Sequence, residues 1–173
     1  MFRLAVFSRI IAIGFPTGIQ SCLYSVANLF IQSSVNSYGT DVVAAYTAFG
    51  KIDALFWNYS GALGTSLLTF TGQNFGAGDL KRVKKGILQG IGIDIAGSLL
   101  ITAVCFFGGI YMFRMFTDDA GVIEAGVSML KYLCPYWVTF AGVEILSSSI
   151  RSCGDSFVPM CMTAVGIGAL RII

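Results

Sequence analysis

The chain has 173 residues, of which 55% are hydrophobic and only 12% are charged, and its net charge is +2. Soluble domains carry about 25% charged residues, so these charges are too few to cover a globular surface and a soluble fold is excluded. There is no histidine, the commonest general base and metal ligand near neutral pH, and the five cysteines are scattered without a C-x-x-C pair. The composition therefore predicts an all-α membrane protein that is not an enzyme, holds no metal or cofactor and has no nucleic-acid partner.

Five apolar segments follow one another along the chain, at residues 10–33, 43–72, 84–112, 127–149 and 156 to the end. A spanning helix needs about 20 mostly apolar residues, so the first four segments can each cross a bilayer and the last is barely long enough. Short polar turns separate the segments and leave no room for a soluble domain. We therefore expect residues 1–173 to form a single, incomplete bundle of about five transmembrane helices.

Basic residues gather at alternate turns of this expected bundle. Seven of them fall on one side: Arg3, Arg9, Lys81, Arg82, Lys84, Lys85 and Arg151. The other side carries a group of acidic residues with only two basic ones, Arg114 and Lys131. The positive-inside rule places the basic side in the cytoplasm. We therefore expect a multi-pass protein of the plasma membrane, in contact with the lipid bilayer and with a cytoplasmic N-terminus.

The stretch GQNFGAGDLKRVKK, residues 72–85, joins three glycines to four of these basic residues. A phosphate-binding loop needs G-x-x-x-x-G-K-[ST] or G-x-G-x-x-G, and neither is present because Lys81 stands where the third glycine would be. We interpret the stretch as a cytoplasmic turn in which glycine permits a tight reversal and Asp79 caps the next helix. Its basic residues would meet anionic lipid headgroups. A direct contact with a ligand is the alternative.

Four ionisable residues lie inside the apolar segments: Lys51, Asp53, Asp94 and Glu144. Each costs about 2.5–3.5 kcal/mol at the centre of a bilayer, so we expect them to face the protein interior or a hydrated cavity. Asp94 is the first candidate to carry a proton or a cation, because it lies in the middle of its segment. The alternatives are a paired structural charge for Asp94 and Glu144, and for Lys51 a side chain that snorkels to the interface.

Helical spacing places polar or small residues on one face of three segments. The first segment has a polar stripe made of Thr17, Gln20, Ser21, Tyr24, Asn28 and Gln32. The third sets Asp94 beside Gly86, Gly90 and Gly97, and the fourth aligns Glu144 with Ser147, Ser148 and Arg151. Three such faces indicate a hydrated cavity, unless the stripe only supplies interhelical hydrogen bonds. In such a cavity, carboxylates and an aromatic ring such as Trp57 would suit a lipophilic cation.

Two further expectations concern the helices themselves. Pro16 lies inside the first segment and is expected to bend it near its cytoplasmic end. Tyr132, Tyr136 and Trp137 begin the fourth segment from the other side, and we expect them to form an aromatic belt at the outer interface.

The stretches GFPTGIQSCLYSVANLFIQSSVNSYGTDVVAAYTAFGKID, GQNFGAGDLKRVKKG and IRSCGDSFVPM follow one another in the chain. In this order and at these separations they resemble the multidrug and toxic compound extrusion (MATE) family of secondary transporters, and more narrowly its C-terminal lobe. The resemblance covers about residues 10–171 and implies helices seven to ten and most of eleven of a twelve-helix, two-lobe transporter. It also assigns motif residues to the start of the seventh helix and to two cytoplasmic turns: Pro16; Gln73, Gly76 and Gly78; and Arg151, Gly154 and Asp155.

The chain departs from the family pattern at two places that matter for ion coupling. Some members carry an acidic cation ligand in the seventh helix, whereas residues 20–24 are uncharged here. The tenth-helix acid of some sodium-coupled members would fall near Phe140 or Val143 and not at Glu144. These ligands are therefore not carried over. Coupling in this lobe would depend on Asp53, Asp94 or Glu144, or the coupling acid would lie in the other lobe.

The function implied is that of one lobe of an exporter for organic cations or other amphipathic, drug-like compounds, driven by protons or sodium ions through alternating access. Its partner would be an N-terminal lobe of the same transporter. A first alternative is a lipid-linked oligosaccharide flippase of the same wider architecture, although three buried acids against one lysine favour a cationic cargo. A second alternative is a truncated half that transports nothing without the other lobe.

Overall fold

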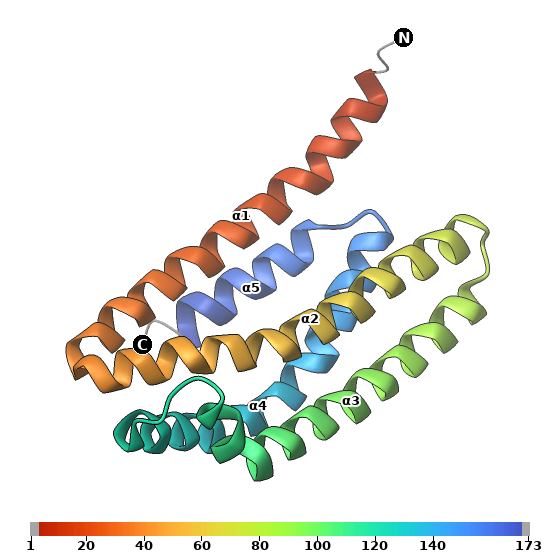
Figure 1. Cartoon of the computed structure of the whole chain (residues 1–173). Coiled ribbons are helices and arrows are strands. Elements are labelled where there is room, and N and C mark those ends of the chain that lie inside the picture. The colour runs from red at the N-terminus through yellow and green to blue at the C-terminus, as the bar shows by residue number, and fades with distance from the viewer. Residues whose placement is uncertain (1–3, 171–173) are drawn as a thin grey trace.

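The computed structural model describes residues 4–170 (Figure 1). Its elements are α1 (Leu4–Val35), the short 3-10 turn η1 (Asn36–Tyr38), α2 (Thr40–Gly76), α3 (Leu80–Arg114), α4 (Ala120–Ser152) and α5 (Phe157–Leu170). No strand occurs in this range, so the predicted all-α membrane fold is confirmed. Two segments within it, Ile10–Tyr38 and Leu80–Arg114, are long and apolar enough on their own to cross a membrane. Arg3 and the end of the last expected segment, 171–173, lie outside the described residues.

The helix ends show why the chain reverses where it does. Gly39, Gly78 and Gly154 have φ values of 94°, 78° and 98°, a left-handed conformation that favours glycine. Asp79 caps α3 as predicted, because its carboxylate accepts a 3.0 Å hydrogen bond from the backbone N–H of Arg82. The Asp119 carboxylate caps α4 in the same way. Turn chemistry encoded locally in the sequence therefore sets the helix boundaries.

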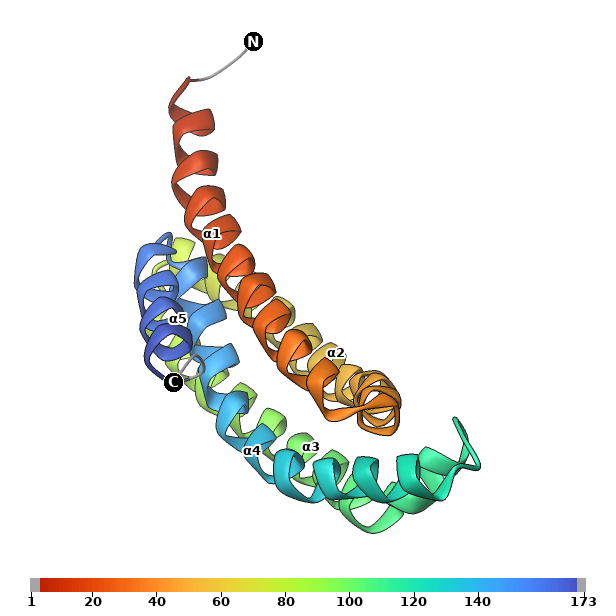
Figure 2. The ribbon, with the colours of Figure 1, turned by 90° about the vertical axis from the view of Figure 1, so that its left-hand side faces the viewer.

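Helices α2, α3 and α4 pack against one another and form a three-helix core. Helix α1 lies beside α5 and makes few contacts with α2 (Figures 1 and 2). The structure keeps α1 continuous through Pro16, and Figure 2 shows the helix curved and not broken. The α2–α3 and α4–α5 turns lie at one end of the molecule, called the basic end below. The η1 turn and the α3–α4 loop lie at the opposite, acidic end.

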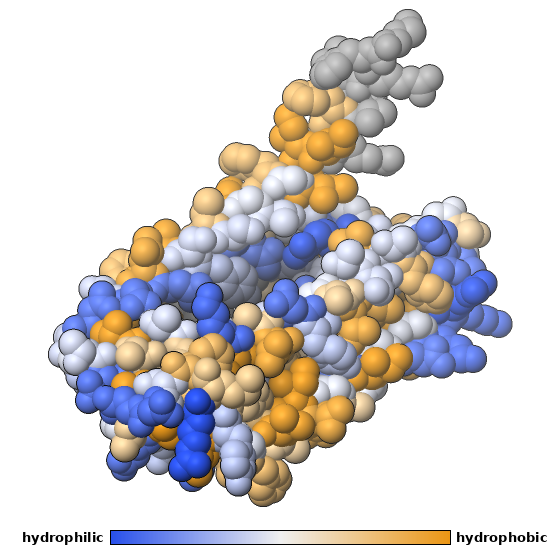
Figure 3. All heavy atoms as spheres, in the orientation of Figure 1, coloured by the Kyte–Doolittle hydropathy of each residue, from blue (hydrophilic) through white to orange (hydrophobic). Residues whose placement is uncertain are grey.

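The hydropathy of the surface follows this arrangement. Figure 3 shows hydrophilic side chains gathered at both ends, with apolar side chains between them. It also shows the face between α1 and α2 hollowed, with hydrophilic side chains inside the hollow. The predicted belt is only partly present: Tyr132 and Tyr136 are exposed, but Trp137 is 4% exposed and belongs to the core. The expectation for Trp137 was wrong because the ring stacks on Phe56 of α2 and does not reach lipid.

The three-helix core is divided along its length. The half near the acidic end is an apolar cluster that includes Ala48, Phe49, Ile52, Phe56, Cys105, Phe113, Leu130, Cys134 and Trp137. The buried polar side chains of the described chain all belong to the half near the basic end: Ser60, Thr71, Asp94, Ser98, Ser148, Ser149 and Ser156. We call these the apolar half and the polar half of the core.

Glycines let α2 approach α3 closely in the polar half. Phe70 packs over Gly86 and Leu67 over Gly90, and at both positions an added Cβ would overlap the α2 side chain. Both glycines are buried, on the same face of α3 as Asp94. The glycine-lined helix contact expected beside Asp94 is confirmed.

We predict that Gly126→Ala destabilises the chain more than Gly142→Ala. Both glycines lie on α4 and gain the same helix propensity from alanine. A Cβ at Gly126 would overlap the fully buried ring of Phe113, whereas none of the described atoms lies within 4 Å of a Cβ at Gly142. Overpacking costs about 1–3 kcal/mol. Thermal unfolding in detergent should show a lower midpoint for Gly126→Ala alone, and equal midpoints would contradict the α3–α4 packing.

Candidate functional site

Asp53 lies between the two tryptophans of the chain. Trp57, one turn further along α2, donates its indole N–H to Asp53 Oδ2 at 2.9 Å. Trp137 of α4 donates its indole N–H to Asp53 Oδ1, also at 2.9 Å. Because each carboxylate oxygen accepts a hydrogen bond, Asp53 can stay ionised without facing bulk water. The charge is thus fixed in position between two aromatic rings.

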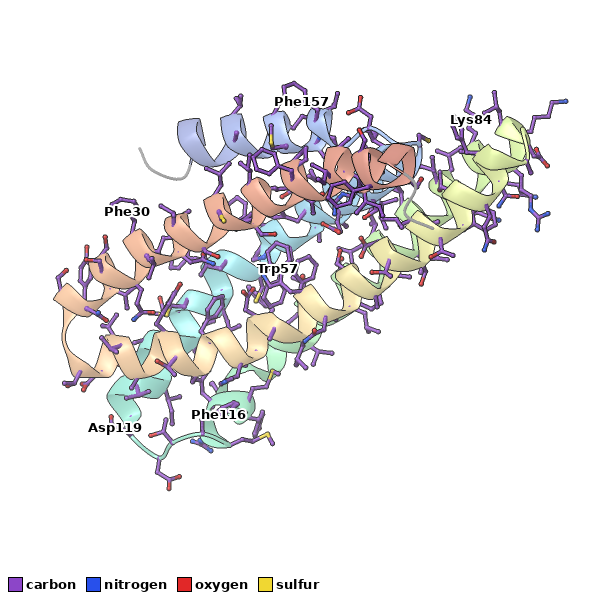
Figure 4. All side chains as sticks on the ribbon, turned by 90° about the horizontal axis from the view of Figure 1, so that it is seen from above. Phe30, Trp57, Lys84, Phe116, Asp119 and Phe157 are labelled. Atoms are coloured by element: carbon purple, nitrogen blue, oxygen red, sulfur yellow. The ribbon has the colours of Figure 1, made fainter. Side chains whose placement is uncertain are left out.

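Aromatic rings extend this site from the buried Trp137 to the exposed Trp57 and Phe140. The Phe56 and Trp137 rings are stacked with their centroids 5.2 Å apart. Trp57 packs edge-on against Phe140, at 5.5 Å. Trp57 and Phe140 are 42% and 41% exposed, and Figure 4 shows Trp57 pointing from α2 into the space between α1 and α2. We call Asp53, Trp57, Phe140 and the Trp137 behind them the aromatic–acid site.

This site has the chemistry of a receptor for an organic cation. Ring faces attract a cation within about 6 Å, by about 0.5–1 kcal/mol when exposed and about 2 kcal/mol when desolvated. An ionised carboxylate beside the rings adds a full negative charge. The sequence proposed Asp53 and Trp57 separately, and their spacing of four residues was the available sign that they meet. Trp137 and Phe140 were missed because they join the site only through the packing of α4 on α2.

Asp94 has a different environment. Its side chain is 0% exposed and accepts a hydrogen bond from Ser60 Oγ at 3.0 Å on Oδ2. The buried hydroxyl of Ser98, one turn away on α3, also lies beside the Asp94 carboxyl group, although it closes no second hydrogen bond of good geometry to Oδ1 within the described residues. The ionisable group that acts electrostatically on Asp94 is another acid, Glu144 of α4. An ionised Asp94 would have serine hydroxyls beside it but no positive charge, and a buried charge without a counter-ion costs several kcal/mol. A protonated Asp94 avoids this cost and gains an O–H donor.

The Glu144 carboxylate of α4 packs against α2 at Gly64, where the helix has no side chain. It is half-buried, and its Oε1 accepts a 3.3 Å hydrogen bond from Ser148 Oγ. A Cβ placed on Gly64 of α2 would lie 2.9 Å from both of these oxygens. Glycine at position 64 therefore leaves the space that the carboxylate occupies, one helical turn from the Ser60 that binds Asp94.

The α1 stripe is only partly directed at other helices. Gln20 accepts a hydrogen bond from Arg151 Nη2 at 3.2 Å, which links α1 to the end of α4. Thr17 and Ser21 donate to carbonyls of their own helix, and Gln32 donates to the Asn36 side chain at 2.9 Å. Tyr24 is half-buried and Asn28 is exposed.

The remaining candidate residues lie at the surface or in turns. Lys51 is exposed, which excludes the protein interior for this residue and leaves a hydrated cavity or a side chain that snorkels to the interface. Gln73 is exposed, Gly76 ends α2 and Gly78 makes the reversal. Asp155 accepts a 2.9 Å hydrogen bond from the backbone N–H of Phe157 at the start of α5. The described residues contain no cluster of three metal-ligating side chains.

Comparison with known proteins decides the family. The MatE family profile matches residues 16–173, nearly the whole chain. The chain belongs to the MatE family. The resemblance seen in the sequence is confirmed.

Relatives of the chain carry names from transport and drug resistance. It is 28% identical over 94% of its length to the probable multidrug resistance protein YpnP of Bacillus subtilis, covering 36% of that protein. It is 22% identical over 95% of its length to the probable multidrug resistance protein NorM of Thermotoga maritima, covering 35%. It is 27% identical over 69% of its length to an FAD transporter of Shewanella oneidensis, covering 26%. The chain thus spans about a third of the length of the first two relatives.

We predict that Asp53→Asn changes one of the two indole environments and lowers stability. The amide retains one acceptor oxygen and presents an NH₂ group to the other indole, which loses its acceptor. Leaving a buried donor unpaired costs about 1–3 kcal/mol. Proton NMR of the two indole N–H groups, with thermal unfolding in detergent, measures both effects. Asp118→Asn, in the exposed α3–α4 loop, is the control, and two unshifted indole signals would contradict the geometry.

Proposed function

We propose that the chain is one lobe of a secondary active exporter that moves organic cations or other amphipathic compounds out of the cell. The basic end lies in the cytoplasm and the acidic end outside, by the positive-inside rule. An N-terminal lobe completes the cargo cavity, and alternating access exposes the cavity to each side in turn. Protons or sodium ions bound at buried carboxylates drive the cycle.

The aromatic–acid site carries this proposal. It combines an oriented carboxylate with two exposed aromatic rings, Trp57 and the Phe140 that packs against it. Trp57 points into the space between α1 and α2 (Figure 4), the face that Figure 3 shows hollowed. Charge attracts a cation from a distance, while ring faces bind flat or lipophilic cations with little demand on shape. A site of this kind accepts many cargoes, which fits relatives named as multidrug resistance proteins.

Two other functions fit the site less well. A lipid-linked oligosaccharide flippase, or a carrier of an anionic compound such as the relative named an FAD transporter, would need basic groups to hold phosphate. The ionisable side chains that reach the middle of the core, Asp53, Asp94 and Glu144, are acids. Lys51 is exposed, and Arg151 lies at the end of α4, where it binds Gln20. The remaining alternative is a truncated half that transports nothing without the other lobe. Experiment tests it, because cation binding at the aromatic–acid site requires this chain alone whereas transport requires both lobes.

We predict that the chain alone binds an aromatic lipophilic cation and discriminates against its uncharged analogue. Equilibrium dialysis in detergent measures both affinities. Trp57→Ala should weaken cation binding by roughly 5–30-fold, the equivalent of about 1–2 kcal/mol for a partly desolvated cation–π contact. Tyr111→Ala, an exposed aromatic position on α3, should leave it unchanged. Equal affinity for the charged and uncharged compounds would argue against the site.

We also predict that Asp94→Asn weakens ion-coupled efflux while expression stays normal. Amide and acid have the same shape, but the amide cannot bind and release a proton or neutralise a cation. Efflux of a cationic dye from vesicles, with the proton and sodium gradients collapsed in turn, measures the coupling. The assay compares this chain alone with the chain produced together with its N-terminal lobe. Unchanged efflux by Asp94→Asn would remove Asp94 from the mechanism.

A further inference from the structure

The polar half of the core contains a connected row of polar groups that ends at the basic end. Its deepest member is Asp94, whose Oδ2 accepts a hydrogen bond from the hydroxyl of Ser60 on α2. One turn along α2, about 6 Å nearer the basic end at helical rise, Gly64 leaves the space that holds the Glu144 carboxylate. One turn of α2, from Ser60 to Gly64, therefore lies against two acids from different helices, Asp94 of α3 and Glu144 of α4. We call this row the acid row.

The acid row continues from Glu144 to the basic end of the molecule. Glu144 binds Ser148, one turn further along α4. Arg151 follows after three more residues and reaches Gln20, while its Nε is buried without a hydrogen-bond partner in the described chain. The hydroxyls of Thr71 and Ser156, in the same half, are also buried and unpaired within residues 4–170. Buried polar atoms of this kind are normally satisfied by ordered water.

Toward the acidic end, the core offers Asp94 fewer polar partners. Beyond Ser60, the buried face of α2 continues with Phe56, Ile52 and Phe49, all in the apolar half. None of the buried polar side chains described for this structure lies in that half. Cys105 and Cys134 fill the corresponding positions on α3 and α4. The nearest acid in that direction, Asp53, lies seven residues from Ser60 along α2 and has an indole N–H on each oxygen. The polar groups around Asp94 therefore continue toward the basic end of the core.

The surroundings of Asp94 fit a proton better than a metal cation. The titratable groups facing it are Glu144 from α4 and Tyr59 from α2, and Tyr59 donates its own proton to the backbone carbonyl of Ile93 at 2.8 Å. The neutral oxygens at hand are the hydroxyls of Ser60 and Ser98. Hard metal cations take about six or more oxygen ligands, whereas one proton converts the unpaired Oδ1 into a donor.

We propose that Asp94 is a proton-binding carboxyl that exchanges its proton with the basic end of the molecule through Glu144. The O–H bond of Asp94 breaks, the proton passes to the Glu144 carboxylate directly or through water, and it leaves from there to solvent. Reprotonation follows the reverse route. Within the proposed function, on which this role depends, Asp94 is the ion-coupling group and Glu144 the relay that releases its proton to the cytoplasm.

Hydrogen–deuterium exchange followed by infrared spectroscopy tests the proposal on the purified full chain in lipid. A protonated carboxyl has its own carbonyl stretch, which shifts when deuterium replaces the proton. Asp94→Asn should remove one such band, and this assigns it. If Asp94→Asn does not fold, Ser60→Ala assigns the band instead, because loss of the hydrogen bond to Oδ2 shifts its frequency.

Paired variants then test the route. Gly64→Ala forces the flexible end of Glu144 away from α2, and Glu144→Gln removes the relay, so each should slow deuterium exchange at Asp94 by at least about tenfold, since a positioned side chain speeds proton transfer by about 10²–10⁴-fold. Gly61→Ala is the matched control on the same helix, where none of the described atoms lies within 4 Å of an added Cβ. It should exchange like the unchanged chain.

Each outcome decides for or against the acid row. Loss of a band in Asp94→Asn together with slow exchange in Gly64→Ala and Glu144→Gln supports it. The absence of any protonated band assignable to Asp94, or equal exchange rates in Gly64→Ala and Gly61→Ala, overturns it. The measurement uses neither cargo nor an ion gradient. Its failure would therefore leave cation binding at the aromatic–acid site intact, and failure of cation binding would leave the acid row intact.

Discussion

A carboxyl group in the middle of a membrane bundle is tolerated when it is neutral or when a compensating group lies beside it. Asp94 has serine hydroxyls and another acid as neighbours, and no basic group among them, so the proposed protonated state removes a charge that nothing beside it would neutralise. The small residues around it follow from this constraint. Glycines bring α2 close enough for Ser60 to reach the carboxyl, and the small side chains of Ser60 and Ser98 occupy the space around it.

Two acids on adjoining helices thus have opposite environments. Asp53 has an indole N–H on each oxygen and lies beside exposed rings, whereas Asp94 is enclosed. The first suits a permanent negative charge that meets a cargo, and the second suits a group that gains and loses a proton. Both connect to α2, and Asp53 and Ser60 are seven residues apart, about 10 Å along one helix. A single rigid element therefore links the two environments, with Phe56 between them.

Much of this architecture is visible in the sequence, because it depends on local patterns. Apolar length, alternating turn charge and the spacing of glycines around Asp94 gave five helices, their order and one packing face. The meeting of Gly64 with Glu144, and of Trp137 with Asp53, depends on how α4 lies against α2, which no single segment encodes. Trp137 was assigned to the lipid interface together with Tyr132 and Tyr136 because all three begin the fourth segment from its outer side. Its stacking on Phe56 is a tertiary contact.

The pairing of α1 with α5 has a consequence for biosynthesis. The hydrogen bond between Gln20 and Arg151 joins two residues that are 131 positions apart, so it cannot form until Arg151 has been synthesised. At about 5–20 residues per second, the ribosome needs on the order of ten seconds to make the intervening polypeptide. During that interval α1 lacks the Arg151 hydrogen bond and the α5 neighbour that it has in the folded chain. Helix α1 therefore completes its packing only after α4 and α5 have been made.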